Sequence, residues 1–510
     1  MRKKWFRQIL RRRILVILLL LLQGVVLFEL ITNTSQLIRW VNMLLSAASF
    51  LAALKIVSSR DKPTYKLLWV FLILSFPVFG GIFYLLVYLQ TSPRFINKKL
   101  PKIEEESRIA LNDNGEGYKQ AYQMASDYAV QLRYLQKQGF QVYEHTYCDY
   151  LSPGEKVFAA LIPELKAAEN YIFLEFFIIQ EGIMWDTIHD ILKEKASQGI
   201  LVRVLYDDIG SFLTLPKDYA KQLEGEGIQC SVFNPFRPIL SSLQNNRDHR
   251  KIISIDGKVA FTGGFNLADE YINAIEKHGY WKDAGLMLRG EAAWSLTVMF
   301  LQMWSLSNHM QEDFLKYFPW GNAGCPENSD GFVLPYSDKP LDRENIREHV
   351  YLQIINRAKN YVYINTPYLI IDDSMVSALS LAAKSGVDIR IITPHHWDKW
   401  IVHMTTRSYY PALLEAGVKI YEYTPGFIHA KTFVSDDRIA TVGTINLDYR
   451  SLYLHFECGV WMWGNRVINQ VKDDFLGTLN ECQEITMESC RHGVIFRVFQ
   501  EILRLLAPLF

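Results

Sequence analysis

The sequence lacks the usual marks of metal, disulfide and nucleotide chemistry. None of its six cysteines forms a CxxC pair, and no histidine-rich companion stands at zinc spacing. A glycine-rich nucleotide loop of the usual spacing is also missing. The sequence therefore predicts neither a metal site nor a cofactor. We expect reduced, mainly structural cysteines at positions 148, 230, 325, 458, 482 and 490.

An excess of charge of either sign is missing too. The 510 residues contain 54 basic and 54 acidic side chains, so the formal net charge is zero. This balance argues against a nucleic-acid partner held by general electrostatic attraction. Hydrophobic residues make up 49% of the chain, which is enough for two or three domains with large cores.

Three uncharged apolar runs stand near the N-terminus. Residues 14–28 and 40–54 form runs of 15, and residues 67–89 form a run of 23. A membrane-spanning helix needs roughly 20 apolar residues, which the third run supplies alone and the others reach if their flanking charges snorkel. No small-residue cleavage site follows the first run, so a signal peptide is disfavoured. We predict membrane-anchoring helices over residues 1–95 and a multi-pass protein of the cell membrane.

The orientation of these helices is less simple. Basic residues flank the runs in the tail 2–13, in the segment 60–66 and at the exit 94–99, and basic flanks favour the cytoplasm. Three complete spans cannot place all three flanks on one side. We therefore expect one run to be re-entrant or a hairpin, and Pro77 with Gly80 and Gly81 marks a weak point in the third. We expect the catalytic region in the cytoplasm.

Two further segments flank the central part of the chain. Residues 96–140 are polar and are interpreted as a linker with helical stretches, in which the acidic run 104–106 is a solvated face. Residues 486–510 are predicted to include an amphipathic helix with Arg497, Glu501 and Arg504 on one stripe. Apolar residues surround that stripe, which favours a position in a membrane interface.

The central region is an internal repeat. His249, Lys251 and Asp256 recur with the same spacing as His429, Lys431 and Asp436. Each set is followed by a small-residue pair and an asparagine: Gly263-Gly264 with Asn266, and Gly443-Thr444 with Asn446. Upstream, each unit shows a strand, a helix and a second strand. The pattern predicts an α/β protein with two similar domains, over residues 141–325 and 326–485.

The doubled motif suits phosphoryl transfer. One imidazole can attack the phosphorus of a phosphodiester and hold the phosphoryl group covalently. A second can protonate the leaving alkoxide and later deprotonate the acceptor. Paired lysines and asparagines can stabilise the added negative charge without a metal. A single motif supplies only half of these groups, so the two domains must face each other across one site.

These motifs resemble the HKD motifs of the phospholipase D superfamily, and the longer matches resemble bacterial cardiolipin synthases. The matching stretches include RDHRKIISIDGKVAFTGGFNLADEY, TPYLIIDDSMVSAL and GTINLDYRSLYLHFE. The resemblance implies mixed sheets flanked by helices, and a reaction that converts two phosphatidylglycerol molecules into cardiolipin and glycerol. Thr444 replaces a serine of many members and keeps the hydroxyl group.

The resemblance also implies residue roles. His249 would be the nucleophile that becomes phosphatidyl-histidine, and His429 the general acid and base. Lys251, Lys431, Asn266 and Asn446 would bind phosphate, and Asp256 and Asp436 would complete the catalytic motifs in a supporting role. The substrate partners would be phosphatidylglycerol and the lipid bilayer.

A nucleophilic imidazole needs a partner, usually a carboxylate, to fix its second nitrogen. Asp283 and Glu457 stand at comparable places after the two motifs, and the resemblance implies that they cross between domains. Asp283 would then orient His429, and Glu457 would orient His249, at about 2.6–3.2 Å. The alternative is that both are surface acids on strands.

Three other functions stay open from the sequence. A phospholipase or another phosphatidyltransferase would share every catalytic residue and differ only in the acceptor. A membrane-tethered nuclease is disfavoured by the neutral charge, and a non-enzymatic scaffold by the two intact motifs. Among the other histidines, His395, His396 and His403 follow a predicted strand and are interpreted as loop residues. The rest are interpreted as structural or surface residues: His145, His189, His278, His309, His349, His455 and His492.

Overall fold

The computed structural model describes residues 36–59, 62–76, 79–84, 94–111, 116–236, 245–319, 328–340, 344–491 and 493–509. They belong to two compact units. One comprises Met1–Arg94, Phe236–Asn246 and Glu501–Phe510, and the other comprises Phe95–Pro235 and Arg247–Gln500. The basic tail, the first apolar run, Cys325 and His492 lie outside the described residues.

The N-terminal unit contains a helical hairpin. Helix α2 (Gln36–Ser58) packs against α3 (Pro63–Ser75) through Ala52, Ala53 and Ile56 on one side and Trp69 and Ile73 on the other. Helix α3 begins at a proline, whose fixed φ suits the first helical turn. It ends before residue 77, where the sequence predicted a weak point, and a short helical segment over residues 79–84 follows.

Glycine allows this segment to approach α2. A Cβ on Gly81 would lie only 2.1 Å from Oγ of Ser49. The interruption leaves α3 with 13 residues. Of the helices that the structure describes, none combines the length and the apolar character needed to cross a bilayer.

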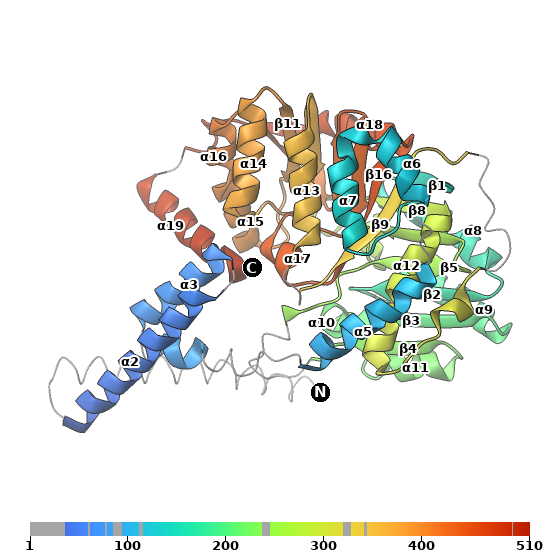
Figure 1. The fold of residues 1–510 in the computed structure, drawn as a ribbon, viewed down its shortest axis with the longest axis horizontal. Coiled ribbons are helices and arrows are strands. Elements are labelled where there is room, and N and C mark those ends of the chain that lie inside the picture. The colour runs from blue at the N-terminus through green and yellow to red at the C-terminus, as the bar shows by residue number, and fades with distance from the viewer. Residues whose placement is uncertain are drawn as a thin grey trace. The chain divides into compact units, whose positions relative to one another are not determined.

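The first repeat forms a seven-stranded mixed sheet, drawn in teal to yellow-green in Figure 1. Its order is β1-β8-β6-β5-β2-β3-β4. These strands are β1 (Thr146–Leu151), β2 (Tyr171–Phe176), β3 (Leu201–Asp207), β4 (Gln229–Phe233), β5 (Ile252–Ile255), β6 (Val259–Gly263) and β8 (Gly285–Gly290). Only β2, β3 and β4 pair in parallel, and β2 is buried along its whole length because helices cover the sheet.

The second repeat forms an eight-stranded mixed sheet of the same topology with one added edge strand. Its order is β17-β12-β11-β10-β14-β15-β16-β9. These strands are β9 (Phe332–Asp338), β10 (Tyr361–Asn365), β11 (Asp388–Pro394), β12 (Lys419–Tyr423), β14 (Thr432–Ser435), β15 (Ile439–Gly443), β16 (Glu457–Trp463) and β17 (Cys482–Ile485). Strand for strand, β10 and β14 correspond to β2 and β5, so the predicted duplication is confirmed in the fold.

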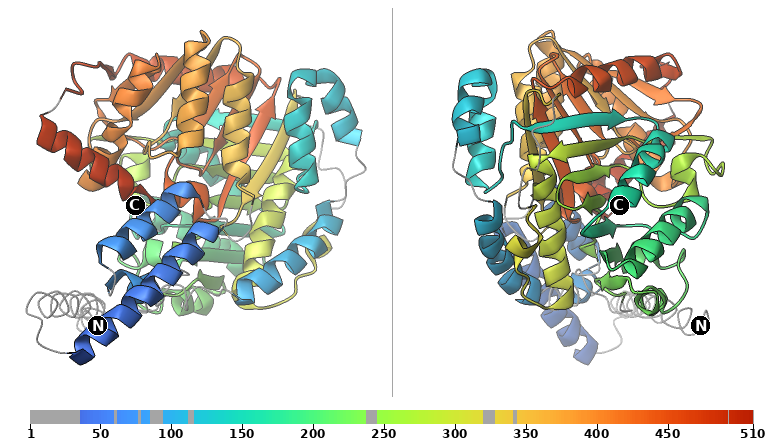
Figure 2. Two further views of the ribbon diagram at one scale, coloured as in Figure 1. Left: turned by 60° about the vertical axis from the view of Figure 1, so that its left-hand side comes forward. Right: turned by 90° about the vertical axis from the view of Figure 1, so that its right-hand side faces the viewer.

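Helices surround the two sheets, as two further views show (Figure 2). In the first half these are α8 (Gly154–Ala167), α9 (Ile183–Ser197), the short α10 (Asp208–Ser211), α11 (Tyr219–Gly225) and α12 (Glu291–Asn308). In the second half they are α13 (Ile346–Arg357), α14 (Asp373–Lys384), α15 (Trp400–Ser408), α16 (Tyr410–Glu415), α17 (Tyr449–Tyr453) and α18 (Val467–Leu479). Residues of α12 and α18 share one buried cluster with strands of both sheets. The halves therefore share a core.

The segment expected to be a linker packs onto this body. It contains α5 (Arg94–Leu111), α6 (Glu116–Met124) and α7 (Ala129–Lys137). The Trp461 indole donates to the Gln131 side-chain oxygen at 3.2 Å, and the Trp294 indole donates to the carbonyl of Ala110 at 2.9 Å. The acidic run is only partly solvated, because Glu104 pairs with Lys339. Near the C-terminus, α19 (Val494–Leu505) is the predicted amphipathic helix.

Two short strands join the halves directly. Strand β7 (Tyr280–Lys282) of the first half pairs in parallel with β13 (Gly426–Ile428) of the second. An isolated parallel bridge joins Asp248 to Phe456 in the same way. Each connection ends next to a motif histidine. The five described cysteines are free.

Candidate active site

Each motif histidine is fixed by a backbone hydrogen bond to the opposite half. The N–H of His249 donates to the carbonyl of Phe456 at 3.0 Å, and the N–H of His429 donates to the carbonyl of Lys282 at 2.7 Å. The residue that follows each acceptor in the chain is a carboxylate. The inter-half strand pairing therefore brings each imidazole next to an acid of the other half.

The side chains complete this crossed arrangement. Nδ1 of His249 lies 2.9 Å from Oε1 of Glu457, and Nδ1 of His429 lies 2.6 Å from Oδ2 of Asp283. Both carboxylates are fully buried. The predicted geometry is confirmed, and the alternative of surface acids is wrong. With each Nδ1 engaged by a carboxylate, Nε2 is the ring nitrogen left for other contacts.

Further hydrogen bonds hold each carboxylate in place. Hydroxyl groups of Thr444 and Ser451 donate to Glu457, the latter at 2.6 Å. The N–H of Ala284 donates to Oδ1 of Asp283 at 2.8 Å. The hydroxyl of Thr444 thus helps to hold the carboxylate that contacts His249, a role that the sequence did not indicate.

The motif lysines are buried beside the histidines. Nζ of Lys251 donates to the carbonyl of His249 at 2.6 Å, and Lys431 donates in the same way to the carbonyl of His429. Burial lowers the pKa of Lys251 to about 8 and that of Lys431 to about 7, although nearby carboxylates act in the opposite direction.

The asparagines of the two motifs differ in their contacts. Asn266 accepts from the N–H of Ile178 at 3.1 Å and donates to the hydroxyl of Tyr271 at 2.7 Å. Oδ1 of Asn446 is buried and has no hydrogen-bond partner within the described part of the chain. A buried acceptor without a partner is costly, so this oxygen is suited to receive a donor from a ligand.

The motif aspartates do not join the histidines. The carboxylate of Asp256 accepts from the N–H groups of residues 169, 170 and 171 at 2.7–2.8 Å. That of Asp436 accepts from the N–H groups of residues 359, 360 and 361 at 2.7–2.9 Å. Both lie in the left-handed region, with φ of 53° and 55°, at the turn that follows β5 or β14. Each aspartate therefore ties the C-terminal end of β5 or β14 to the start of the neighbouring strand, β2 or β10.

Burial governs the electrostatics of the site. Desolvation and the two motif lysines hold the pKa of both imidazoles, His249 and His429, well below the usual range. Desolvation raises the pKa of Asp283 and of Glu457 to about 7, against the attraction of the lysines. Each lysine acts on both imidazoles, so the two motifs form one electrostatic site.

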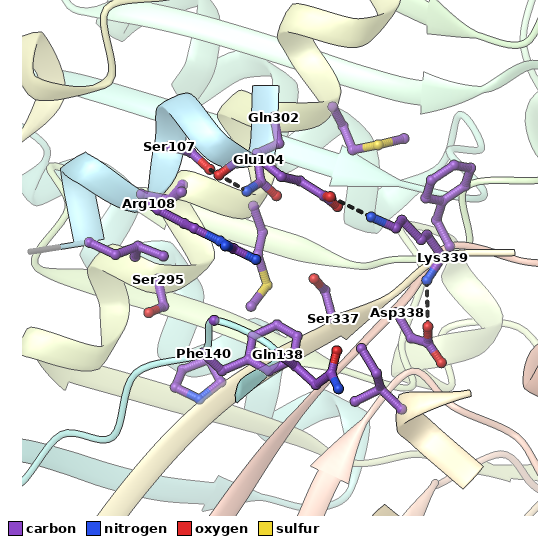
Figure 3. Close-up of a pocket in the computed structure, with 18 of the residues that line it drawn as sticks. Glu104, Ser107, Arg108, Gln138, Phe140, Ser295, Gln302, Ser337, Asp338 and Lys339 are labelled. Atoms are coloured by element: carbon purple, nitrogen blue, oxygen red, sulfur yellow. Dashed lines mark hydrogen bonds and ion pairs between the residues drawn. The ribbon is translucent and has the colours of Figure 1, made fainter. Parts of the chain in front are cut away.

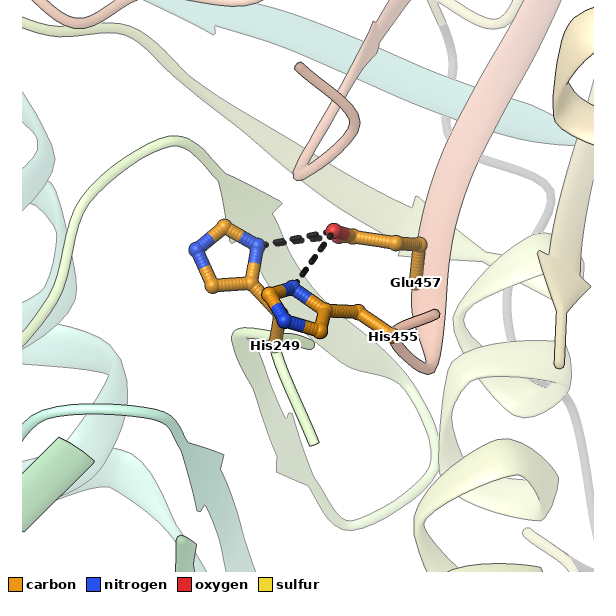
Figure 4. A group of neighbouring side chains, drawn as sticks. All are labelled: His249, His455 and Glu457. Atoms are coloured by element: carbon orange, nitrogen blue, oxygen red, sulfur yellow. Dashed lines mark hydrogen bonds and ion pairs between the residues drawn. The ribbon is translucent and has the colours of Figure 1, made fainter. Parts of the chain in front are cut away.

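Sequence reasoning missed His455. This residue was expected to be structural or on the surface, but its Nδ1 lies 3.9 Å from Oε1 of Glu457. Its ring centroid lies 5.5 Å from that of His249. Figure 4 shows both imidazoles directed at one carboxylate. The sequence could have indicated this, because His455 stands two residues before Glu457 and alternate residues of an extended segment point to the same side.

The other histidines singled out form a separate cluster. Nδ1 of His395 lies 2.9 Å from Oε2 of Glu422, which also binds Arg407 at 2.6 Å. The interpretation of His403 as a loop residue is wrong, because it is buried within α15, where desolvation lowers its pKa to about 4. The carboxylate of Glu422 is therefore paired with cationic and hydrogen-bonding groups of the second half alone.

A polar cavity of about 150 Å³ lies behind the first motif (Figure 3). Glu104 and Lys339 pair across it, and the Gln302 amide donates to the hydroxyl of Ser107 at 2.7 Å. Its lining includes Arg250, which follows the first motif histidine. None of its lining residues is a histidine, motif lysine or motif asparagine, so this cavity is distinct from the candidate active site.

Comparison with known proteins is consistent with this geometry. The family model described as "Cardiolipin synthase, PLD-like domain" matches residues 161–304 and 351–479, and "Phospholipase_D-nuclease N-terminal" matches residues 47–87. The chain is 34% identical over 502 residues to the cardiolipin synthase of Halalkalibacterium halodurans, covering 95% of this chain and 99% of that protein. It is 44% identical over 465 residues to an uncharacterized protein of Streptococcus mutans, covering 90% of this chain and 99% of that protein.

A solved structure shares the fold. The phosphatidylserine synthase of Haemophilus influenzae Rd KW20 superposes with a TM-score of 0.57 and 13% sequence identity. The match covers 71% of this chain and 95% of that one.

Proposed function

The chain belongs to the family of cardiolipin synthases with phospholipase-D-like domains, and on this premise we propose that it joins two phosphatidylglycerol molecules into cardiolipin and releases glycerol. The observation that carries the proposal is the crossed pairing of two buried imidazoles with two buried carboxylates. This arrangement supplies one nucleophile and one acid–base group, each with a fixed Nδ1.

In the first step, Nε2 of His249 attacks the phosphorus of one phosphatidylglycerol. The bond to the headgroup glycerol breaks, and His429, protonated once the negative substrate phosphate offsets the charges of the motif lysines, donates a proton to the departing oxygen. In the second step, a hydroxyl of another phosphatidylglycerol gives its proton to His429 and attacks phosphorus. The histidine–phosphorus bond breaks, so the proton and the nucleophile return to their starting states.

The remaining motif groups stabilise charge. Lys251, Lys431 and the amides of Asn266 and Asn446 surround the phosphate and its five-coordinate transition state. The two halves have different partners around their histidines, which is consistent with different roles in one cycle. Glu457 accepts from two hydroxyl groups, whereas Asp283 accepts from a backbone N–H.

Lipid substrates must reach the site from a bilayer, and exposed apolar side chains near the motifs support this. The ring centroid of Phe177 lies 5.1 Å from that of His249. Helix α10 contacts Phe177 through Ser211, and Leu213, just after this helix, is 82% exposed. In the second half, Tyr368 donates to Asp398 at 2.6 Å, and the neighbouring Trp400 is exposed. Docking of such residues on a membrane would exclude competing water.

The N-terminal unit supports attachment to the membrane. Large apolar residues are exposed on the outer faces of α2 and α3, among them Trp40, Leu44, Phe71 and Leu74. We place the protein in the cell membrane with its catalytic halves in the cytoplasm. Protease digestion of intact and opened cells tests the orientation, because a cytoplasmic domain is cleaved only after opening.

Membranes containing the protein and labelled phosphatidylglycerol provide the functional test. Cardiolipin and glycerol in equal amounts are expected, and His249→Ala membranes serve as the control. Phosphatidic acid as the main product would instead identify a phospholipase. Absence of any lipid product would contradict the proposal and favour a nuclease or a scaffold.

A further inference from the structure

His455 adds an imidazole to the candidate active site that the proposed reaction does not use. It is buried, and its Nδ1 is directed at the carboxylate that also holds His249, 3.9 Å from Oε1 of Glu457. The side chain lies against His249 and Glu457 (Figure 4).

The three residues together offer the donors of a metal site. One atom of each lies within 4.8 Å of the others. In a tetrahedral zinc site, donors at 2.0–2.2 Å from the ion stand roughly 3.3 Å apart. The distances of 2.9 Å from His249 to Glu457 and 3.9 Å from His455 to Glu457 bracket this value. Small side-chain movements would therefore suffice.

The surroundings favour a preformed site. Hydroxyl groups of Thr444 and Ser451 already hold the carboxylate of Glu457, as supporting residues hold ligands in metal sites. The positive charges of the motif lysines repel a bound cation, and the negative charge of the buried Glu457 carboxylate offsets this repulsion.

We propose that His249, His455 and Glu457 form a binding site for a divalent cation of the zinc class, and that this cation switches the nucleophile off. Two imidazoles and a carboxylate match the ligand preference of Zn²⁺. The fourth position is left for water or an oxygen of the substrate phosphate. The cation is an inhibitor here and takes no part in the proposed reaction.

The inhibition follows from the tautomers of His249. Without metal, Nδ1–H donates to Glu457 and the lone pair of Nε2 faces phosphorus. A cation that binds Nδ1 displaces this proton. A neutral ring must then carry its proton on Nε2, which removes the attacking lone pair. Formation of the phosphatidyl-histidine bond is blocked until the cation leaves.

Direct binding of zinc chloride to the purified full-length protein tests the site without relying on its activity. One Zn²⁺ per chain is expected by calorimetry, and His455→Asn should weaken binding by at least about tenfold, since even supporting residues of metal sites contribute this much. His395→Asn is the matched control, because this histidine also pairs with a buried glutamate, but outside the site. Its zinc affinity should equal that of the wild type.

A second measurement covers the case in which His455→Asn fails to fold. Wild-type protein loaded with Co²⁺ should show the intense visible bands of tetrahedral cobalt, and Zn²⁺ should abolish them. No binding, only the weak bands of hydrated cobalt, or equal affinity in wild type and His455→Asn would overturn the site. Binding without inhibition of lipid transfer would overturn the switch, and an inactive protein that still binds Zn²⁺ would count against the proposed function alone.

Discussion

Nδ1 of His429 lies 2.6 Å from Oδ2 of Asp283, although the two residues come from opposite halves and stand 146 positions apart. His249 and Glu457 repeat this relationship in the other direction. Neither imidazole is oriented by its own half. The two imidazole–carboxylate pairs are therefore aligned only when both halves have folded and docked.

The first prediction concerns the division of work between the histidines. His249→Ala should abolish the phosphatidyl-enzyme adduct, because no nucleophile remains. His429→Ala should still form the adduct from a lipid whose leaving group needs no proton, such as a nitrophenyl ester. Mass spectrometry of the quenched enzyme locates the adduct, and phosphate on His429 would reverse the assignment.

The second prediction concerns the crossed carboxylates. Glu457→Gln and Asp283→Asn should each lower kcat by roughly 10²–10⁴-fold, because an amide in place of the carboxylate disturbs the tautomer of its histidine. The Glu457 variant should slow adduct formation with any lipid. The Asp283 variant should recover with a leaving group that needs no proton. Equal recovery in both variants would contradict the crossed assignment.

The third prediction uses a glycine next to a carboxylate. A Cβ on Gly264 would lie 2.1 Å from Oδ1 of Asp283 and 2.9 Å from the carbonyl oxygen of His429. Gly264→Ala should displace this pair and lower kcat by about 10²-fold, the usual effect of a 1 Å misplacement. Gly477→Ala in α18 is the control, because no atom beyond its chain neighbours and the backbone of its own helix lies within 4 Å of the added carbon. Normal kcat in Gly264→Ala would show that the pair tolerates movement.

The fourth prediction separates structure from catalysis within the motifs. Asp256→Ala and Asp436→Ala each remove a carboxylate that accepts three backbone N–H groups, so each should lower the free energy of unfolding by about 1–3 kcal/mol. The kcat of the remaining folded enzyme should change little. Denaturant unfolding checks this, with the exposed Asp190→Ala as control. A collapse of kcat at unchanged stability would instead make these residues catalytic.

The fifth prediction is the dependence of activity on pH. The carboxylates of Asp283 and Glu457 must be ionised to accept from imidazole, so kcat/KM should rise as pH increases through their pKa of about 7. Lys431, with a pKa of about 7, and Lys251, with a pKa of about 8, lose their charges as the pH rises further, and activity should fall again. The two limbs report the coupled site as a whole.

The double variant Lys251→Arg/Lys431→Arg tests the assignment of the falling limb. Arginine stays protonated throughout, so this limb should move to higher pH. A flat wild-type profile between about pH 6 and pH 9 would contradict the proposed protonation states.

Much of the fold was determined by the sequence itself. The repeat of His249 and Lys251 at the spacing of His429 and Lys431 predicted two equivalent α/β halves, because a strand carries its side chains at fixed intervals whatever packs around it. The weak point at residue 77 likewise followed from local chemistry, because proline disfavours a helical conformation in the residue before it.

The tertiary structure decided what lies between the halves. A motif read along the chain cannot show that Asp256 faces backbone N–H groups, since its partners lie 85–87 positions away. Nor can it show that His455 shares a carboxylate with His249, 206 positions away. The contact of His455 with His249 depends on the pairing of Asp248 with Phe456, which only the docked halves create, whereas Asp256 finds its partners within the first half. Burial at that junction, in turn, sets the pKa values of the site, because desolvation acts only after the halves exclude water.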